Sequence, residues 1–178
     1  MSGHNKWSQI KNAKAKTDGA RSKVFAKMVK LLSVESKKAG GDVNSPGLRN
    51  AIEKARKVNM PMDNIDRAVK KGTDGSESLE KVIYEIYGPE GSQIIVTALT
   101  DSTNRTNQEI KHLVSKNGAS MGGAGSVMWN FTFDVQTSEY TPQTSMEISD
   151  SAEETLNNLL SLLDDHDDVE DIFTNISE

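Results

Sequence analysis

The chain has 178 residues, a formal net charge of −5 and no cysteine. Its length fits one or two small domains with a real hydrophobic core. The lack of cysteine excludes disulfides, thiol nucleophiles and cysteine-ligated zinc or iron–sulfur sites. No apolar run approaches the roughly 20 residues of a membrane helix, and the first residues lack the apolar stretch of a signal peptide. We therefore expect a cytoplasmic protein that has no contact with membranes.

Charge is divided unevenly between the two parts of the chain. Residues 1–81 carry 18 of the 21 Lys and Arg residues and 9 of the 26 Asp and Glu residues, which gives them a net charge of +9. Residues 82–178 have a net charge of −14. This division is typical of a polyanion-binding module followed by an acidic one.

The first 72 residues are predicted to be helical. Val24, Met28 and the pair Leu31–Leu32 recur at helical spacing and form an apolar stripe. Gly40 and Gly41 end this helix. A second helix follows and is broken by Pro61, and a third ends at a capping Gly72. These three helices predict a small domain, which a polar linker at 73–78 separates from the rest.

After the linker, the apolar period changes to that of strands. Two runs, 82–87 and 93–99, flank a Gly-Pro-Glu-Gly turn. The elements expected beyond them are a helix at 104–117, strands at 126–133 and 135–148, a helix at 149–166 and a strand at 169–176. The order βαββαβ is the ferredoxin-like pattern, with a first strand that is itself read as a hairpin. We therefore predict an α+β protein with a basic helical domain at 1–78 and an acidic ferredoxin-like domain at 79–178.

The basic N-terminal stretch gives the strongest functional signal. Residues 1–40 hold ten Lys or Arg residues against only Asp18 and Glu35. Lysines in such density bind phosphates through the release of counterions. The residues expected to contact phosphate are Lys6, Lys11, Lys14, Lys16, Arg21, Lys23, Lys27 and Lys30. Trp7 lies among them and either stacks on an unpaired base or anchors the tail to the core.

Three features of the acidic part admit a functional and a structural interpretation. The Gly-rich stretch 121–126 lacks the lysine of a phosphate loop and runs from a helix into a strand, so we interpret it as a backbone turn, with a contact surface for a large partner as the alternative. Arg105 is interpreted as an ion-pair partner near a helix cap, or as a further phosphate contact. The run Asp164–Asp168 is interpreted as a solvated helix end and turn rather than a metal site, because consecutive side chains point in different directions.

No arrangement of residues points to catalysis. None of the three histidines, His4, His112 and His166, has a nearby nucleophile and carboxylate that would indicate a triad. The sequence therefore predicts a protein that is not an enzyme. We expect no catalytic residue, no metal, no cofactor and no small-molecule substrate.

Short motifs along almost the whole chain resemble the YebC family. The opening Gly3-His4-Asn5-Lys6-Trp7 is similar to the Gly-His-Ser-Lys-Trp with which members of this family begin. Further matches follow in the same order: Met60–Ile65, Arg67-Ala68, Lys71-Gly72, Tyr84-Glu85, Tyr87–Pro89, Leu99–Asp101, Asn104–Thr106, Lys116–Gly118, Gly125–Val127, Leu163–Asp165, Asp167–Val169 and Asn175. Their order and spacing make the resemblance specific.

The resemblance implies an N-terminal helical domain and two α+β domains, the third inserted into the second. The similarity runs to about Phe131 and resumes near Pro142, where family members carry a long insertion. This chain is therefore expected to have a simple hairpin in place of the third domain. The family includes the mitochondrial translational activator of cytochrome oxidase. Many members are labelled probable transcriptional regulators that bind DNA, and others act on the ribosome to ease the synthesis of difficult sequences such as proline runs.

Both activities require contact with nucleic acid. Because the basic residues are spread along several helices rather than gathered on one recognition helix, we favour backbone contacts over base readout. We predict a non-catalytic, monomeric translation factor that contacts rRNA, tRNA or the ribosome. The alternatives are a transcriptional regulator bound to promoter DNA and a protein-interaction module whose basic arm meets an acidic partner.

Overall fold

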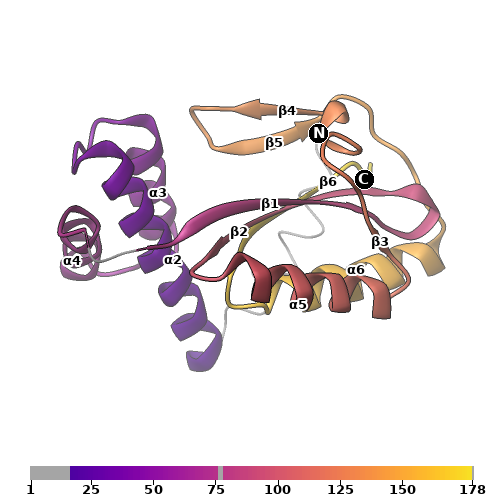
Figure 1. Ribbon diagram of the computed structural model, residues 1–178, viewed down its shortest axis with the longest axis horizontal. Helices are drawn as coiled ribbons and strands as arrows, with labels where there is room; N and C mark the ends of the chain where they lie inside the picture. The colour runs from indigo at the N-terminus through magenta and orange to yellow at the C-terminus, as the bar shows by residue number, and fades with distance from the viewer. Residues whose placement is uncertain (1–16, 76–77, 178) are drawn as a thin grey trace.

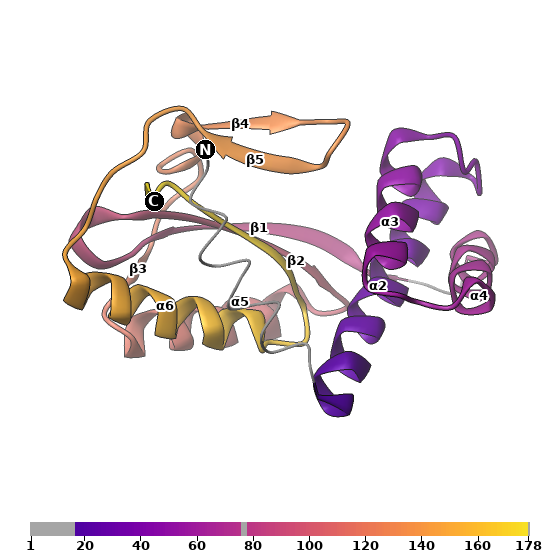
Figure 2. The same ribbon diagram turned by 180° about the vertical axis from the view of Figure 1, so that it is seen from behind.

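The computed structural model describes residues 17–75 and 78–177. A group of helices lies at one end of a β-sheet, two further helices cover one face of the sheet, and a hairpin lies over the other face (Figures 1 and 2). The helices are α2 (Asp18–Ala39), α3 (Pro46–Lys57), α4 (Met62–Thr73), α5 (Thr103–Lys116) and α6 (Asp150–Asp164), with short 3-10 turns η1 (Pro89–Gly91) and η2 (Met128–Asn130). The strands are β1 (Glu80–Tyr87), β2 (Gln93–Thr100), β3 (Ser120–Met121), β4 (Phe131–Asp134), β5 (Glu139–Pro142) and β6 (Val169–Thr174). The α+β class with helices first is confirmed.

The three N-terminal helices pack around their own apolar cluster. Thr17 caps α2 by accepting a hydrogen bond from the Ala20 N–H, and Gly40 ends α2 in the left-handed conformation at φ 59°. Proline at the first position of α3 fits a helix start, where the missing N–H would be unpaired. The buried members of the cluster are Leu32, Leu48, Ala51, Ala55, Met60, Ile65 and Ala68. The predicted stripe of α2 contributes Met28, Leu31 and Leu32 to it.

The main sheet has four strands in the order β3-β1-β2-β6, and every neighbouring pair is antiparallel. Strands β1 and β2 form the hairpin that was expected for the first strand, in register from Glu80 opposite Thr100 to Tyr87 opposite Gln93. Strands β4 and β5 form a separate two-stranded sheet. The chain thus has a hairpin at 131–142, where the resemblance led us to expect one.

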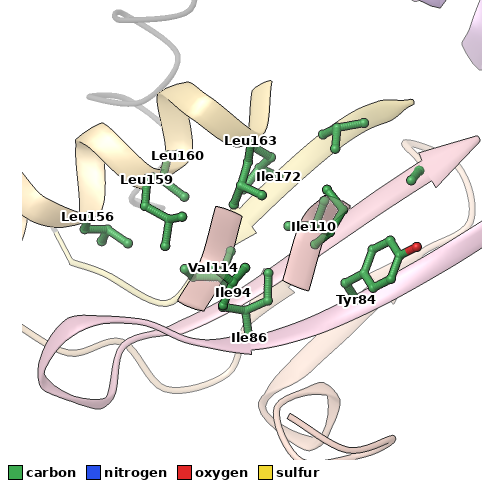
Figure 3. Close-up of a cluster of buried hydrophobic side chains, with 13 residues drawn as sticks. Tyr84, Ile86, Ile94, Ile110, Val114, Leu156, Leu159, Leu160, Leu163 and Ile172 are labelled. Carbon is green, nitrogen blue, oxygen red and sulfur yellow. The ribbon is translucent and has the colours of Figure 1, made fainter. Parts of the chain in front are cut away.

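The first face of the sheet is covered by α5 and α6 (Figure 3). Both helices present apolar residues at helical spacing toward it. The buried residues of this cluster are Tyr84, Ile86, Ile94, Val96, Ala98, Ile110, Val114, Leu156, Leu159, Leu160, Leu163, Val169 and Ile172. Each buried Val, Leu or Ile side chain of this cluster stabilises the fold by about 1.5–3 kcal/mol when it leaves water.

The second face of the sheet is covered by the β4–β5 hairpin and the loop before it. Ile95 and Phe173 of the sheet pack there against Val127, Phe131 and Tyr140. Strand β2 is therefore buried on both faces, and this explains its unbroken apolar run from Ile94 to Val96.

Two expected strands differ from the structure. The strand expected at 126–133 is a turn followed by η2, and only 131–134 are extended. The polar strand expected at 135–148 is limited to 139–142. Ser102 is the residue before the first turn of α5. Among the described helices, none is both long and apolar enough to cross a membrane.

Candidate nucleic-acid interface

A row of three lysines on α2 faces the C-terminal end of α6. The Nζ atoms of Lys23, Lys27 and Lys30 donate to the carbonyl oxygens of Asp165, Asp164 and Asp167 at 3.1, 2.6 and 3.1 Å. Their spacing of i, i+4 and i+7 places the three amines on one face of the helix. The contact partner is a part of the same chain more than 130 residues away.

The end of α6 attracts cations for two reasons. The last carbonyl groups of a helix have no partner within the helix and carry the negative end of the helix dipole. The last turn of α6 contains no basic residue of its own, and four aspartates surround it. The lysines of α2 therefore supply the positive charge that this helix end lacks. We call the contact between the α2 lysines and residues 164–168 the α2–α6 junction.

Asp168 lies at the centre of the α2–α6 junction and is buried. Its Oδ2 accepts hydrogen bonds from Arg105 Nη2 at 2.7 Å and Thr106 Oγ1 at 2.8 Å, and its Oδ1 accepts one from Lys30 Nζ at 3.0 Å. Burial alone would raise the pKa of Asp168, but these hydrogen bonds and the charge of Lys30 outweigh it. The pKa of the carboxyl is therefore held well below its ordinary value, and the group stays ionised.

This geometry corrects the interpretation of residues 164–168 as a solvated turn. The backbone carbonyls of Asp164, Asp165 and Asp167 bind lysines of α2, and the side chain of Asp168 is buried. The four aspartates in the sequence do not reveal these contacts. Hydrogen bonds to backbone oxygens depend on the fold rather than on side-chain identity.

The ligand atoms of Glu109, His166 and Asp168 lie within 4.8 Å of one another. His166 Nδ1 accepts the Asp168 N–H, so in the neutral ring Nε2 carries the proton and donates to Glu109 Oε2 at 2.9 Å. Both Asp168 oxygens are engaged by cationic groups. The atoms that could bind a metal ion already take part in hydrogen bonds, and the cationic Arg105 and Lys30 lie beside them. The arrangement therefore does not suit a metal ion.

A second set of contacts joins the helical domain to the sheet. Lys54 of α3 forms an ion pair with Asp171 at 2.9 Å, and Asn50 donates to Ser138 Oγ in the β4–β5 turn at 3.3 Å. Burial would lower the pKa of Lys54, but the charge of Asp171 and the hydrogen bond to it outweigh this and raise the pKa. Lys54 therefore remains charged and ties α3 to β6.

The predicted contact residues thus fall into three groups. Lys6, Trp7, Lys11, Lys14 and Lys16 lie outside the described residues. Arg21 is exposed near the start of α2. Lys23, Lys27, Lys30 and Arg105 are brought together at the α2–α6 junction, and Arg105 also pairs with Asp101 at 3.0 Å, as its structural interpretation anticipated.

The Gly-rich loop is held by a residue that the sequence reasoning missed. Glu85 projects from β1 on the hairpin side, is buried, and accepts the backbone N–H groups of Gly125, Val127 and Met128 at 2.6–2.7 Å. Burial would raise the pKa of Glu85, but these three bonds hold it below its ordinary value. A carboxylate flanked by Tyr84 and Ile86 in an apolar strand was the available signal.

Two family models match consecutive parts of the chain. The TACO1/YebC protein N-terminal domain matches residues 5–75, and the TACO1/YebC second and third domain matches residues 79–137. A probable transcriptional regulatory protein of Halothermothrix orenii is 40% identical over an alignment that covers 100% of this chain and 76% of that protein. The chain belongs to the TACO1/YebC family.

Other TACO1/YebC relatives are more similar over a shorter region. Probable transcriptional regulatory proteins of Thermoanaerobacter pseudethanolicus and Fervidobacterium nodosum are 52% and 48% identical over 134 residues, which cover 74% of this chain. These alignments take in 54% and 53% of the two relatives, so the chain spans about half the length of curated relatives that it matches.

A solved structure shares the TACO1/YebC fold seen here. The conserved hypothetical protein Aq1575 from Aquifex aeolicus superimposes with a TM-score of 0.80 at 27% identity, and the match covers 92% of this chain and 93% of that one.

Proposed function

We propose that this chain is a non-catalytic regulator of gene expression that binds RNA through its basic N-terminal segment, most directly on the ribosome. The single observation that carries the proposal is the division of charge, with 18 of 21 cationic residues in the first 81 positions. A polyanion is the partner that such a segment attracts, because each neutralised phosphate releases counterions. The names of the relatives, probable transcriptional regulatory proteins, support a regulatory role.

The contacts at the α2–α6 junction refine which cations meet the phosphates first. Lys23, Lys27 and Lys30 already bind the end of α6. The first contacts are therefore assigned to Lys6, Lys11, Lys14 and Lys16, which lie in a stretch without any carboxylate, and to the exposed Arg21. The three α2 lysines and Arg105 contact phosphate only where the nucleic acid displaces the acidic end of α6.

Binding to labelled single-stranded RNA at several salt concentrations tests the proposal. A variant with Lys6, Lys11, Lys14 and Lys16 changed to Gln loses up to four phosphate contacts. Its slope of log affinity against log salt is then expected to fall by about 3, since each contact to a single strand contributes roughly 0.7. A matched variant with Lys57, Lys70, Lys71 and Lys116 changed to Gln removes the same charge elsewhere. Equal slopes for the two variants would contradict the assignment.

DNA is the second candidate ligand, favoured by the names of the relatives. Sedimentation of the full chain with ribosomes through sucrose separates the two. Co-sedimentation at low and moderate salt, with weak and sequence-independent binding to duplex DNA, supports the ribosomal role. Absence from ribosomal fractions together with nanomolar binding to one promoter would establish the transcriptional role instead.

The absence of catalysis is also part of the proposal. The polar groups that converge around Asp168 and His166 are hydrogen-bonded to one another. A catalytic base or nucleophile needs a lone pair directed at a substrate, whereas the hydrogen bonds of Asp168 and His166 join them to partners within the chain. The cluster is therefore assigned to holding α2 and α5 on the end of α6.

A further inference from the structure

Trp129 is an aromatic side chain that the fold exposes and at the same time orients. It is 64% exposed, although tryptophan is usually largely buried. Its indole Nε1–H donates to the carbonyl oxygen of Ser126 at 2.9 Å. This bond holds the indole against its own loop before any ligand binds. Binding therefore costs less side-chain entropy than it would for a mobile ring.

The loop that carries the ring is itself fixed. The buried carboxylate of Glu85 accepts three N–H groups of the loop, and the Tyr87 hydroxyl donates to the same Ser126 carbonyl at 2.7 Å. Gly122 packs so closely on Ser126 that a side chain would collide with it, and Gly125 has a φ of 80°. The fold therefore requires glycine at both positions.

Gly123 is a glycine that the fold does not require. Its φ is outside the left-handed region, and a Cβ atom added there would meet no atom of the described residues within 4 Å. Gly123 and Ala124 are exposed, and within residues 17–75 and 78–177 neither N–H has a hydrogen-bond partner. The absence of a side chain at Gly123 leaves these donors open to a close approach from outside.

The segment that carries the ring is electrically neutral. Residues 117–133 contain no ionisable side chain, although they belong to a part of the chain with a net charge of −14. Phe133 is engaged elsewhere, since its ring packs on Tyr140 at 4.8 Å and lies 6.0 Å from the Lys81 ammonium. The Trp129 ring is therefore carried by the same uncharged loop as the two N–H donors, since its indole binds Ser126 O and the Ser126 N–H binds Gly123 O.

An unpaired nucleobase has the matching chemistry. It is flat, aromatic and uncharged, and its edge carries carbonyl and ring-nitrogen acceptors for N–H donors. Base–aromatic stacking tolerates any base and does not depend on phosphate charge. We propose that Trp129 is a stacking platform for one unpaired base of a single-stranded RNA, whose edge accepts the N–H groups of Gly123 and Ala124. This inference rests on the proposed function and adds to it a contact in the acidic part of the chain.

Affinity for two oligonucleotides of equal length tests the platform, one a labelled oligouridylate and the other an abasic strand with the same phosphates. In the full chain, Trp129→Ala is expected to weaken oligouridylate binding roughly tenfold with an unchanged salt slope, and to leave abasic binding unaltered. Gly123→Ala is expected to weaken it severalfold. Val135→Ala removes part of another side chain that is 63% exposed and serves as the control, with no expected change.

The outcomes separate this inference from the proposed function. If the wild-type chain binds both oligonucleotides with a steep salt slope but Trp129→Ala loses nothing, the platform is wrong and the basic interface stands. An equal loss for both oligonucleotides also overturns the platform. If the wild-type chain binds neither oligonucleotide at low salt, the proposed function itself fails. Because the ring is exposed, the melting temperature of Trp129→Ala should match that of the wild type, which shows that the variant is folded.

Discussion

Asp168 is the residue on which the contact between the two parts of the chain depends most. Its two oxygens are shared among a guanidinium, a hydroxyl and an ammonium from three positions, Arg105, Thr106 and Lys30. A buried carboxylate costs free energy unless each oxygen finds such a partner. Conversely, removing the charge takes from Arg105 and Lys30 the buried carboxylate that they share, although Arg105 still pairs with Asp101 and Lys30 still binds the carbonyl oxygen of Asp167.

Asp168→Asn is expected to lower the free energy of unfolding by roughly 2 kcal/mol, less than for a fully buried pair because Arg105 and Lys30 are partly exposed. Urea unfolding at pH 7 measures this loss. Asp167→Asn, at an exposed position 3.7 Å from Lys23, is the control and should change stability little. A larger loss at Asp167 would contradict the assignment of Asp168 as the central residue.

The same carboxyl gives a pH dependence whose sign follows from its pKa. The pKa of Asp168 is lower in the folded chain than its ordinary value of 3.8. Its contribution is therefore complete above pH 3.8 and is lost as the pH falls below that value. The difference in stability between the wild type and Asp168→Asn should shrink over that range, and a constant difference would contradict it.

For single residues, the sequence spacing of Lys23, Lys27 and Lys30 is enough to place them on one face of α2, but it does not reveal which groups they contact. Helical spacing determines the face. Their acceptors are backbone carbonyl oxygens in another part of the chain, and a pattern of side chains does not predict backbone acceptors. The burial of Asp168 was missed for a related reason, since it stands beside three aspartates that resemble a solvated turn.

Among the elements, α2 and α4 make the closest helix contact of the N-terminal domain. Ser33 and Ser36 of α2 donate their hydroxyl groups to the carbonyl oxygens of Ala68 and Val69 in α4 at 3.2 and 2.7 Å. A Cβ atom at Gly72 would collide with the backbone of Ser33 and would lie 2.8 Å from Ser36 Cβ. The two helices thus approach each other most closely where Gly72 meets Ser33 and Ser36.

Gly72→Ala is therefore expected to cost about 1–3 kcal/mol, because rigid backbone must move to admit the methyl group. Thermal unfolding followed by circular dichroism measures the effect. Gly19→Ala provides the control, since a Cβ atom there meets nothing within 4 Å, and it should leave the melting temperature nearly unchanged or slightly higher. Similar destabilisation by both substitutions would contradict the packing explanation, because helix propensity alone favours alanine at both positions.

Gly72 also shows which structural features cannot be predicted from the local sequence. It was interpreted as a helix cap, but α4 continues to Thr73 and the glycine serves the contact with α2. Helix existence followed from apolar spacing, which is a local property. The stretch 126–133 was predicted to be a strand, yet the carboxylate of Glu85 holds its first part in a turn. Such a constraint comes from a distant element.

For the whole molecule, the orientation of the helical domain is expected to depend on the α2–α6 junction. A variant with Lys23 and Lys27 changed to Met removes the amines that bind Asp165 and Asp164. It should lose roughly 1 kcal/mol per lysine in urea unfolding, as expected for partly exposed charged hydrogen bonds. Small-angle X-ray scattering should show a larger radius of gyration.

The control for this prediction has Lys57 and Lys70 changed to Met, which removes the same charge from exposed positions on α3 and α4. This control should retain both the stability and the radius of gyration of the wild type. If the control expands as much as the test variant, net charge rather than the α2–α6 junction sets the arrangement of the two domains.

The α2–α6 junction also has a consequence for how the protein is made. The lysines of α2 are synthesised early, whereas the carbonyl groups that bind them belong to residues 164–167. The helical domain has its own apolar cluster within residues 25–69 and can fold as soon as that stretch leaves the ribosome. Its lysine row then stays open to solvent while about a hundred further residues are translated, and it closes only when α6 and the residues after it emerge.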